Sequence, residues 1–146
     1  MSGEGIRQFA PHPAVSIIIP AYNTAAYISD TLNSVFAQTR TDYEVIVIND
    51  GSPDTDELER VLVPYRERIR YLKQENRGLS GARNTGIRTT RAPLIALLDS
   101  DDMWEPQYLA VQLDALERDP TIDVVYANAL VFGDAPEAGR TLMELS

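Results

Sequence analysis

One stretch, residues 93–106, limits most strongly what this chain can fold into. Its first part, Leu94–Leu98, is five apolar residues in a row, the pattern of a short strand that is buried on both faces. Three aspartates then fall within four positions, at Asp99, Asp101 and Asp102. Two like charges 4 Å apart repel by about 4 kcal/mol at an effective dielectric constant of about 20, so we expect a partner that offsets them.

Two interpretations of this acidic stretch are open. A divalent cation would offset the charges, because hard ions such as Mg²⁺ bind carboxylate oxygens and complete their shell with water and substrate phosphates. Ligands of open α/β sheets bind beyond the carboxyl ends of the strands, which is where these carboxylates would lie. Alternatively, the aspartates form a solvated acidic turn that caps the next helix.

Length and composition restrict the class of protein. With 146 residues the chain is long enough for one domain with a substantial core. Its net charge of −9 disfavours a nucleic-acid partner, and the absence of cysteine excludes a disulfide framework or a thiolate metal site. No apolar run approaches the roughly 18 residues of a membrane span, and no secretory signal is visible. We therefore expect a cytoplasmic protein without a transmembrane segment, with peripheral membrane attachment of the full-length protein as a second option.

Five strands are predicted to alternate with helices along the chain. Apolar, largely β-branched runs mark the strands, at 15–19, 43–48, 69–73, 94–98 and 122–131. The alternation predicts a mostly parallel sheet with right-handed crossovers, a Rossmann-like layer with helices on both faces. Five strands are too few for an eight-stranded barrel. We divide the chain into a flexible leader, a sheet domain and a tail, at residues 1–14, 15–131 and 132–146.

Polar clusters follow three of the predicted strands. They are Pro20 to Asn23, Asn49 to Asp54 and Asp99 to Asp102. Because parallel strands end at one edge of a sheet, the clusters would open onto the same crevice. A crevice with Asp50 on one side and with Asp99 and Asp101 on another would suit a nucleotide and a metal ion.

Two glycines interrupt a stretch that is otherwise helical, residues 76–87. Within a helix, Gly81 and Gly86 would each cost about 0.8–1 kcal/mol relative to alanine. Their presence predicts that the backbone there closely approaches another element or a ligand.

Four motifs together resemble those of family 2 glycosyltransferases of the GT-A fold. They are Val15–Asn23, Val47–Ser52, Asn76–Asn84 and Leu98–Asp102. Any one of them alone would be a weak signal, whereas their order and spacing match together over residues 14 to 131. The chain is similar to the nucleotide-sugar-binding part of such an enzyme, and we expect it to be the N-terminal part of a longer catalytic domain.

The resemblance implies roles for the first two clusters. Asp50 would accept a hydrogen bond from the nucleotide base, typically from uracil N3–H. Pro20, Ala21, Tyr22 and Asn23 would contribute to nucleotide-sugar binding, with Ala21 and Tyr22 shaping the base pocket. The alternative for Asp50 is that it only closes an Asp–Gly turn.

The resemblance also implies roles for the acidic stretch and the arginines. The D-x-D element of the family falls on Asp99 and Asp101, to which we assign a divalent cation, Mg²⁺ or Mn²⁺. Asp101 would bind the metal directly, and Asp99 would reach the ribose or a metal-bound water. Arg83 would face the base or the diphosphate, with Arg77 as a second candidate, unless Arg83 is a helix-surface arginine paired with a nearby acid. Many relatives have aspartate at the position of Asn49, so a secondary contact there stays open.

The expected activity is the inverting transfer of a sugar from a metal-bound nucleoside-diphosphate sugar, chiefly a UDP-sugar, to an acceptor hydroxyl. The acceptor would be a saccharide or lipid-linked, in cell-wall or polysaccharide biosynthesis. The family uses a carboxylate as general base on the acceptor, and we expect that base in a C-terminal half that the chain lacks. Apolar surface left uncovered by the missing half would favour a homo-oligomer.

Three other classes compete with this interpretation. A nucleotidyltransferase usually has a glycine-rich, cationic loop after its first strand, but residues 20–23 contain neither glycine nor a cation. A haloacid-dehalogenase-like phosphatase carries D-x-D after its first strand, whereas here the motif follows the fourth, with Met103 in place of Thr or Val. A non-catalytic module that binds a nucleotide sugar without transferring it stays open.

Overall fold

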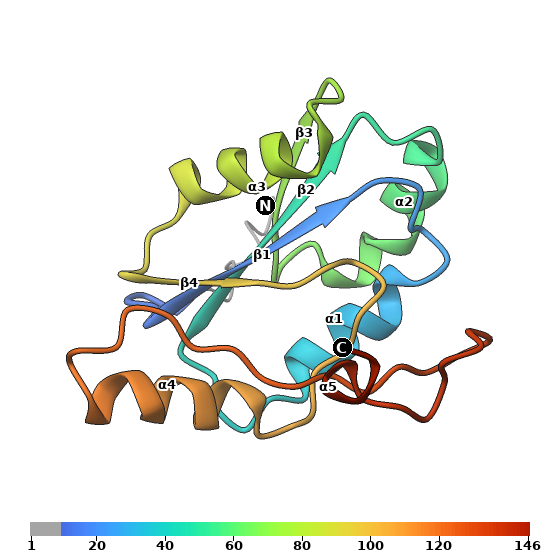
Figure 1. The fold of residues 1–146 in the computed structure, drawn as a ribbon. Coiled ribbons are helices and arrows are strands. Elements are labelled where there is room, and N and C mark those ends of the chain that lie inside the picture. Colours follow the sequence, from blue (N-terminus) through green and yellow to red (C-terminus); the bar gives the residue numbers. More distant parts are fainter. Residues whose placement is uncertain (1–9) are drawn as a thin grey trace. The chain divides into compact units, whose positions relative to one another are not determined.

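The structure, a computed structural model, describes residues 10–146. Residues 1–9, most of the predicted leader, lie outside the described residues. The chain divides into two compact units, Met1–Leu109 and Ala110–Ser146. The sheet belongs to the first unit (Figure 1).

Four strands form the sheet of the described residues. They are β1 (Val15–Ala21), β2 (Tyr43–Asp50), β3 (Arg70–Gln74) and β4 (Leu94–Leu97). Their order is β3-β2-β1-β4, and every neighbouring pair is parallel. The two central strands are buried along their length apart from the first residue of β2, as expected of a parallel sheet that is covered on both faces.

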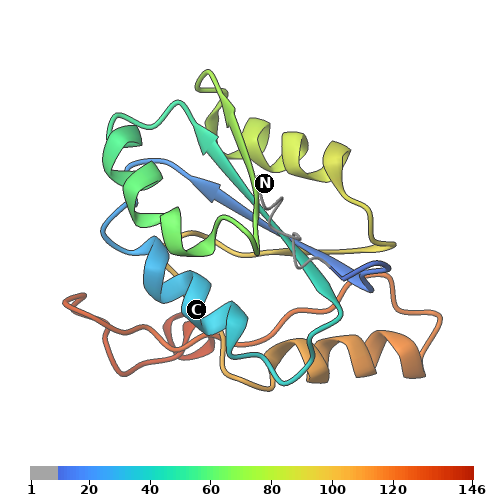
Figure 2. The ribbon, with the colours of Figure 1, turned by 180° about the vertical axis from the view of Figure 1, so that it is seen from behind.

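The strand order decides which face each helix covers. The helices of this unit are α1 (Ile28–Phe36), α2 (Thr55–Val61), a short 3₁₀ helix η1 (Val63–Tyr65) and α3 (Gly78–Thr89). The chain steps in one direction from β1 to β2 to β3 and then returns to β4. Right-handed crossovers therefore place α1 and α2 on one face and α3 on the other, as Figures 1 and 2 show. The predicted α/β fold class is confirmed.

Glycine allows α3 to pack closely on the sheet. A Cβ atom at Gly86 would lie 2.4 Å from Cγ2 of Ile18 and 3.1 Å from Cδ1 of Ile48. The contact is centred on a fully buried cluster of four residues, Ile18, Ile46, Ile48 and Ala82. At Gly81 the corresponding neighbour is Cβ of Arg77, at 2.5 Å. The predicted close approach of the backbone is confirmed, and at Gly86 the approach is to the sheet.

A buried carboxylate stabilises the end of the sheet at which the strands begin. Glu44, only 2% exposed, accepts hydrogen bonds from Ser16 Oγ at 2.6 Å, from the Arg91 backbone N–H at 2.7 Å and from the Arg70 guanidinium at 3.1 Å. Burial acts to raise the pKa of Glu44, but these hydrogen bonds outweigh it, and the pKa lies below its ordinary value. The carboxylate thus ties the loop before β4 to β1 and β3.

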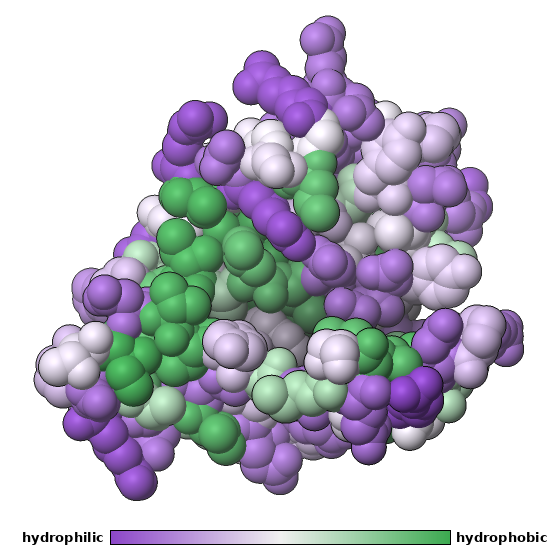
Figure 3. All heavy atoms as spheres, in the orientation of Figure 1, coloured by the Kyte–Doolittle hydropathy of each residue, from purple (hydrophilic) through white to green (hydrophobic). Residues whose placement is uncertain are grey.

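Strand β4 presents apolar side chains on the face that α3 covers. Leu97 is in register with Ile18, which contacts α3, so Leu97 and Ile95 share that face. Ile95 and Leu97 are 44% and 46% exposed. Figure 3 shows the hydrophobic surface that gathers over α3 and β4. The homo-oligomer that such a surface would favour remains a prediction.

The second unit corrects one prediction, because residues 122–131 do not form a strand. A strand needs a neighbour that satisfies its backbone groups, and within this unit the segment has only one antiparallel bridge, between Leu130 and Thr141. Most of its apolar side chains are exposed, to 78% at Val124 and 84% at Tyr126. Among residues 10–146 the sheet therefore has four strands, and the predicted fifth is wrong.

Two helices complete the described chain. Helix α4 (Tyr108–Arg118) crosses the boundary between the units, and α5 (Leu142–Leu145) begins with a capping box formed by Thr141 and Glu144. Within residues 10–146, no helix is both long enough and apolar enough to cross a membrane.

Candidate functional site

A crevice of about 400 Å³ opens beyond the carboxyl ends of β1, β2 and β4. The chain reverses its direction of winding between β1 and β4, and open α/β sheets bind ligands at such a switch point. The volume is in the range of small-molecule sites. The crevice is lined by Pro20, Ala21, Tyr22, Asp50, Asn76, Gly78, Leu79, Ala82, Asp99, Ser100 and Asp101.

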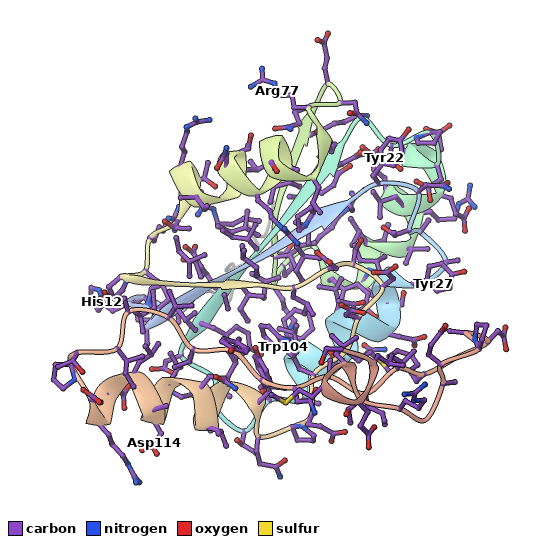
Figure 4. The ribbon with its side chains drawn as sticks, viewed as in Figure 1. His12, Tyr22, Tyr27, Arg77, Trp104 and Asp114 are labelled. Carbon is purple, nitrogen blue, oxygen red and sulfur yellow. The ribbon has the colours of Figure 1, made fainter. Side chains whose placement is uncertain are left out.

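The loop after β1 forms one wall and is fixed by the loop after β2. Tyr22 lies exposed at the end of β1 (Figure 4). Asn23 adopts a left-handed conformation, with φ of 56°, and its N–H donates to Ser52 Oγ at 2.6 Å. The Ala25 N–H donates to Asp54 Oδ2 at 2.9 Å. Asn23 thus holds the loop through its backbone, while its predicted contact with a nucleotide sugar stays a prediction.

Asp50 ends β2 and brings a carboxylate into the crevice. It is 3% exposed, and its Oδ1 accepts hydrogen bonds from Gln74 Nε2 at 2.7 Å and from the Arg77 backbone N–H at 2.9 Å. Its Oδ2 accepts no hydrogen bond from residues 10–146. One oxygen of a nearly buried carboxylate is therefore free to accept a hydrogen bond from a ligand.

Arg83 and Asp99 form an ion pair at the crevice. The Arg83 Nη2 atom lies 2.8 Å from Asp99 Oδ1, and both side chains are partly exposed. The Nε atom of Arg83 is buried and has no acceptor among residues 10–146, although an unpaired buried donor costs about 1–3 kcal/mol. The structure thus places Arg83 beside a lining carboxylate, which is compatible with both of the roles considered for it.

The acidic stretch concentrates negative charge at the end of β4. The pKa of Asp102 is raised from its ordinary value by partial burial and by the charges of Asp101 and Asp99. Among residues 10–146, no three Asp, Glu, His or Cys side chains converge as a complete metal site. Mg²⁺ usually takes only one or two carboxylates and completes its shell with substrate phosphates and water. Asp99 and Asp101, which both line the crevice, fit a site of that kind.

Asn49 is the next-to-last residue of β2 and does not line the crevice. Its Nδ2 donates to Thr55 Oγ1 at 2.9 Å and to Tyr71 Oη at 2.8 Å, and its Oδ1 accepts from the Ser52 N–H at 2.9 Å. Burial is the main cause that raises the pKa of Tyr71 to about 12, and a hydrogen bond to Glu59 adds to it. The polar atoms of Asn49 are therefore used within the protein.

Three other residues lie in different surroundings. The Arg77 side chain is exposed and points outward (Figure 4), so its backbone N–H is what reaches the site. Trp104 stacks on Tyr108, with ring centroids 4.5 Å apart. His12 lies at the opposite end of the sheet from Tyr22 (Figure 4).

The sequence reasoning did not assign five of the lining residues to the site. They are Asn76, Gly78, Leu79, Ala82 and Ser100. Asn76 lies just before α3, and the next three lie in its first part. The approach of α3 to the sheet depends on tertiary packing. A signal was available in Gly78, whose φ of 73° marks the turn into α3. Ser100 is the middle residue of the D-x-D element, and its hydroxyl donates to Thr24 Oγ1 at 2.8 Å.

Comparisons with known proteins agree with the resemblance. The family described as "Glycosyl transferase family 2" matches residues 16–144. An uncharacterized glycosyltransferase of Rickettsia conorii is 43% identical over 107 residues, which are 73% of this chain and 18% of that protein. Chondroitin synthase of Escherichia coli is 41% identical over 117 residues, which are 78% of this chain and 17% of that protein. The chain thus spans less than a fifth of the length of these two relatives.

Two solved structures resemble the chain in fold. The structure of S. aureus TarS 1–349 in complex with UDP has a TM-score of 0.60 and 25% identity, over 71% of this chain and 32% of that one. The mannosyltransferase PcManGT from Pyrobaculum calidifontis, in complex with GDP-Man and Mn²⁺, has a TM-score of 0.67 and 26% identity, over 82% of this chain and 37% of that one. These likenesses confirm the predicted GT-A fold.

Proposed function

This chain belongs to glycosyl transferase family 2, and on that premise we propose that its crevice binds the nucleotide of a nucleoside-diphosphate sugar. The observation that carries the proposal is the free carboxylate oxygen of Asp50 in a crevice that Asp99 and Asp101 also line. The whole protein would transfer the sugar, with inversion at the anomeric carbon, to a hydroxyl of a saccharide or lipid-linked acceptor.

Asp50 would select the base by its hydrogen-bonding edge. Uracil N3–H and guanine N1–H are donors, whereas cytosine N3 and adenine N1 are acceptors that would oppose a carboxylate oxygen. We infer that the donor is a UDP-sugar, because TarS, which the chain resembles, is in complex with UDP. GDP-Man, bound by PcManGT, carries the same kind of ring N–H and is the natural competitor in a test.

The diphosphate would lie toward the acidic stretch and Arg83. Asp99 and Asp101 would hold a divalent cation together with phosphate oxygens of the donor. When bound, the cation would stabilise the negative charge that grows on the leaving nucleoside diphosphate. Arg83 would keep Asp99 in place through their 2.8 Å ion pair. Transfer would further need an oriented acceptor and a general base, and we assign neither to residues of this chain.

Calorimetric titration with UDP and CDP tests the role of Asp50. Asp50→Ala should weaken UDP binding by roughly 10- to 100-fold, because a hydrogen bond to a charged group contributes about 1.5–3 kcal/mol. It should also abolish the preference for UDP over CDP. Asp56→Ala is the matched control, since it removes the same charge from an exposed position in the first turn of α2. An unchanged preference in Asp50→Ala would remove Asp50 from the base pocket and leave it the role of closing a turn.

A further inference from the structure

Asp50 is held in place by two side chains that lie outside the crevice lining. Thr85 Oγ1 donates to Gln74 Oε1 at 2.6 Å, and Gln74 Nε2 donates to Asp50 Oδ1 at 2.7 Å. We propose that Gln74, oriented by Thr85, is a positioning residue that determines which hydrogen-bonding group the crevice presents to a nucleotide base. The inference rests on the proposed function, because it takes Asp50 to contact the base.

The orientation of the Gln74 amide follows from its two neighbours. An amide has one acceptor oxygen and an NH₂ group that only donates, whereas an ionised carboxylate only accepts. If the amide were turned around, its oxygen would face Asp50 Oδ1 at 2.7 Å, and two acceptors would oppose each other. The Thr85 hydroxyl fits the observed orientation, since it lies 2.6 Å from the amide oxygen, to which it donates, and 3.2 Å from its other acceptor, the Gly81 carbonyl. The NH₂ group therefore faces Asp50.

Both donors converge on the same oxygen of Asp50. The Arg77 backbone N–H donates to Oδ1 at 2.9 Å, beside the Gln74 amide, while Oδ2 accepts nothing from residues 10–146. The carboxylate thus has one oxygen engaged with the protein and one left for a ligand. A carboxylate that could rotate freely would lose the directed geometry that selects an N–H group on a base.

Glycine at position 51 lets the segment that carries Gln74 and Arg77 reach Asp50. Gly51 has a φ of 65°, and a Cβ atom there would lie 2.7 Å from the backbone N of Asn76. Another residue at this position would be strained and would push the segment that carries Gln74 and Arg77 away from the carboxylate. The turn after β2 and the segment before α3 are therefore built against each other at Asp50.

The arrangement predicts what an amide at position 50 would do. In Asp50→Asn, the donors from Gln74 and Arg77 would hold the carbonyl oxygen at the position of Oδ1. The NH₂ group would then take the position of Oδ2 and offer a donor to the ligand. A donor there matches cytosine N3 and opposes uracil N3–H, so the preference should change from UDP to CDP.

Calorimetric titration of the whole 146-residue chain with UDP and with CDP, each with Mn²⁺, tests the inference. Wild type should prefer UDP, and Asp50→Asn should prefer CDP. Gln74→Met and Thr85→Val, each made in the otherwise unchanged chain, should lower the preference for UDP over CDP. The ratio of the two affinities should come roughly 3- to 10-fold closer to one, which corresponds to the free energy that one hydrogen bond contributes. Thr89→Val is the matched control, because its hydroxyl donates to the Gly86 carbonyl of the same helix at 2.9 Å. This control should keep the wild-type ratio.

The outcomes separate the inference from the proposed function. Wild type that binds neither nucleotide would overturn the proposed function itself. If wild type prefers UDP, and Gln74→Met and Thr85→Val keep the same UDP-to-CDP affinity ratio, the role of Gln74 is overturned while the proposed function stands. If Gln74→Met fails to fold, as judged by circular dichroism, Thr85→Val decides the question, since it leaves the Gln74 side chain in place. A lower overall affinity with an unchanged ratio counts against positioning as well.

Discussion

Gly86→Ala should destabilise the protein although alanine is the better helix former. A Cβ atom at this position would lie 2.4 Å from Cγ2 of Ile18 and 3.1 Å from Cδ1 of Ile48, and both isoleucines are fully buried. Ordinary contacts of a Cβ atom begin at about 3.4 Å, so α3 or the Ile18 side chain would have to move by about 1 Å. The variant therefore probes how tightly α3 is seated on β1 and β2, and with it the wall of the crevice.

Two opposing free energies set the size of the effect. Replacing a helical glycine by alanine gains about 0.8–1 kcal/mol of helix propensity, whereas overpacking a filled core costs about 1–3 kcal/mol. Ile18 is β-branched and lies in a central strand, so its methyl group has little freedom to turn away. We therefore expect the upper half of that cost and a net loss of about 1–2 kcal/mol. The loss corresponds to a Tm lower by about 3–6 °C.

Urea and thermal unfolding of wild type and variant measure this loss. Asn84→Ala is the control, because it lies exposed on the same helix and should gain a few tenths of a kcal/mol from propensity alone. Ile18→Ala should cost less in the Gly86→Ala background than in wild type, because it removes the clashing methyl group. A Tm of Gly86→Ala equal to or above that of wild type would refute the close packing of α3 on the sheet.

Three further predictions concern charge, cation binding and a partly buried phenol. The pKa of Glu44 is lowered in the folded protein, so the stabilisation by its charged form is present above the ordinary pKa of 4.5 and is lost as pH falls through the folded value. Glu44→Gln should therefore make the urea midpoint less dependent on pH below 4.5. Glu57→Gln, at an exposed position, is the control. Asp101→Ala should abolish the effect of Mn²⁺ on UDP affinity and Asp102→Ala should reduce it less, whereas equal Mn²⁺ effects in wild type and Asp101→Ala would exclude Asp101 from the cation site. In an ultraviolet titration, Tyr71→Phe should remove a phenol that ionises near pH 12, and a loss near the ordinary pKa of 10.0 would contradict its burial.

The sequence predicted the central part of the fold because its strands have an unambiguous pattern. Runs such as Val15–Ile19 are apolar and β-branched, and the observed β1 and β2 extend only two residues beyond the predicted ends. Residues 122–131 have a similar composition but form no strand, because a strand also depends on a neighbour to pair with. A residue pattern records the tendency to be a strand and carries no information about that neighbour.

The candidate site could be predicted in part for a similar reason. Parallel strands end at one edge of a sheet, so the convergence of Asp50, Asp99 and Asp101 on one crevice followed from the order of the elements alone. The contact from Thr85 through Gln74 to Asp50 could not be foreseen, because it depends on how α3 packs against the sheet. Such contacts are set by tertiary packing, which the local sequence pattern does not encode.

Nucleotide binding by the purified 146-residue chain tests the central claim most directly. Calorimetric titrations with UDP, GDP, CDP and ADP, each with and without Mn²⁺, compare bases that carry a ring N–H with bases that carry a ring acceptor at the same edge. We predict that UDP binds most tightly, that CDP and ADP bind least, and that Mn²⁺ strengthens the binding of UDP. Equal binding of all four nucleotides without an effect of Mn²⁺, or no binding at all, would contradict the assignment of this crevice to a nucleoside-diphosphate sugar.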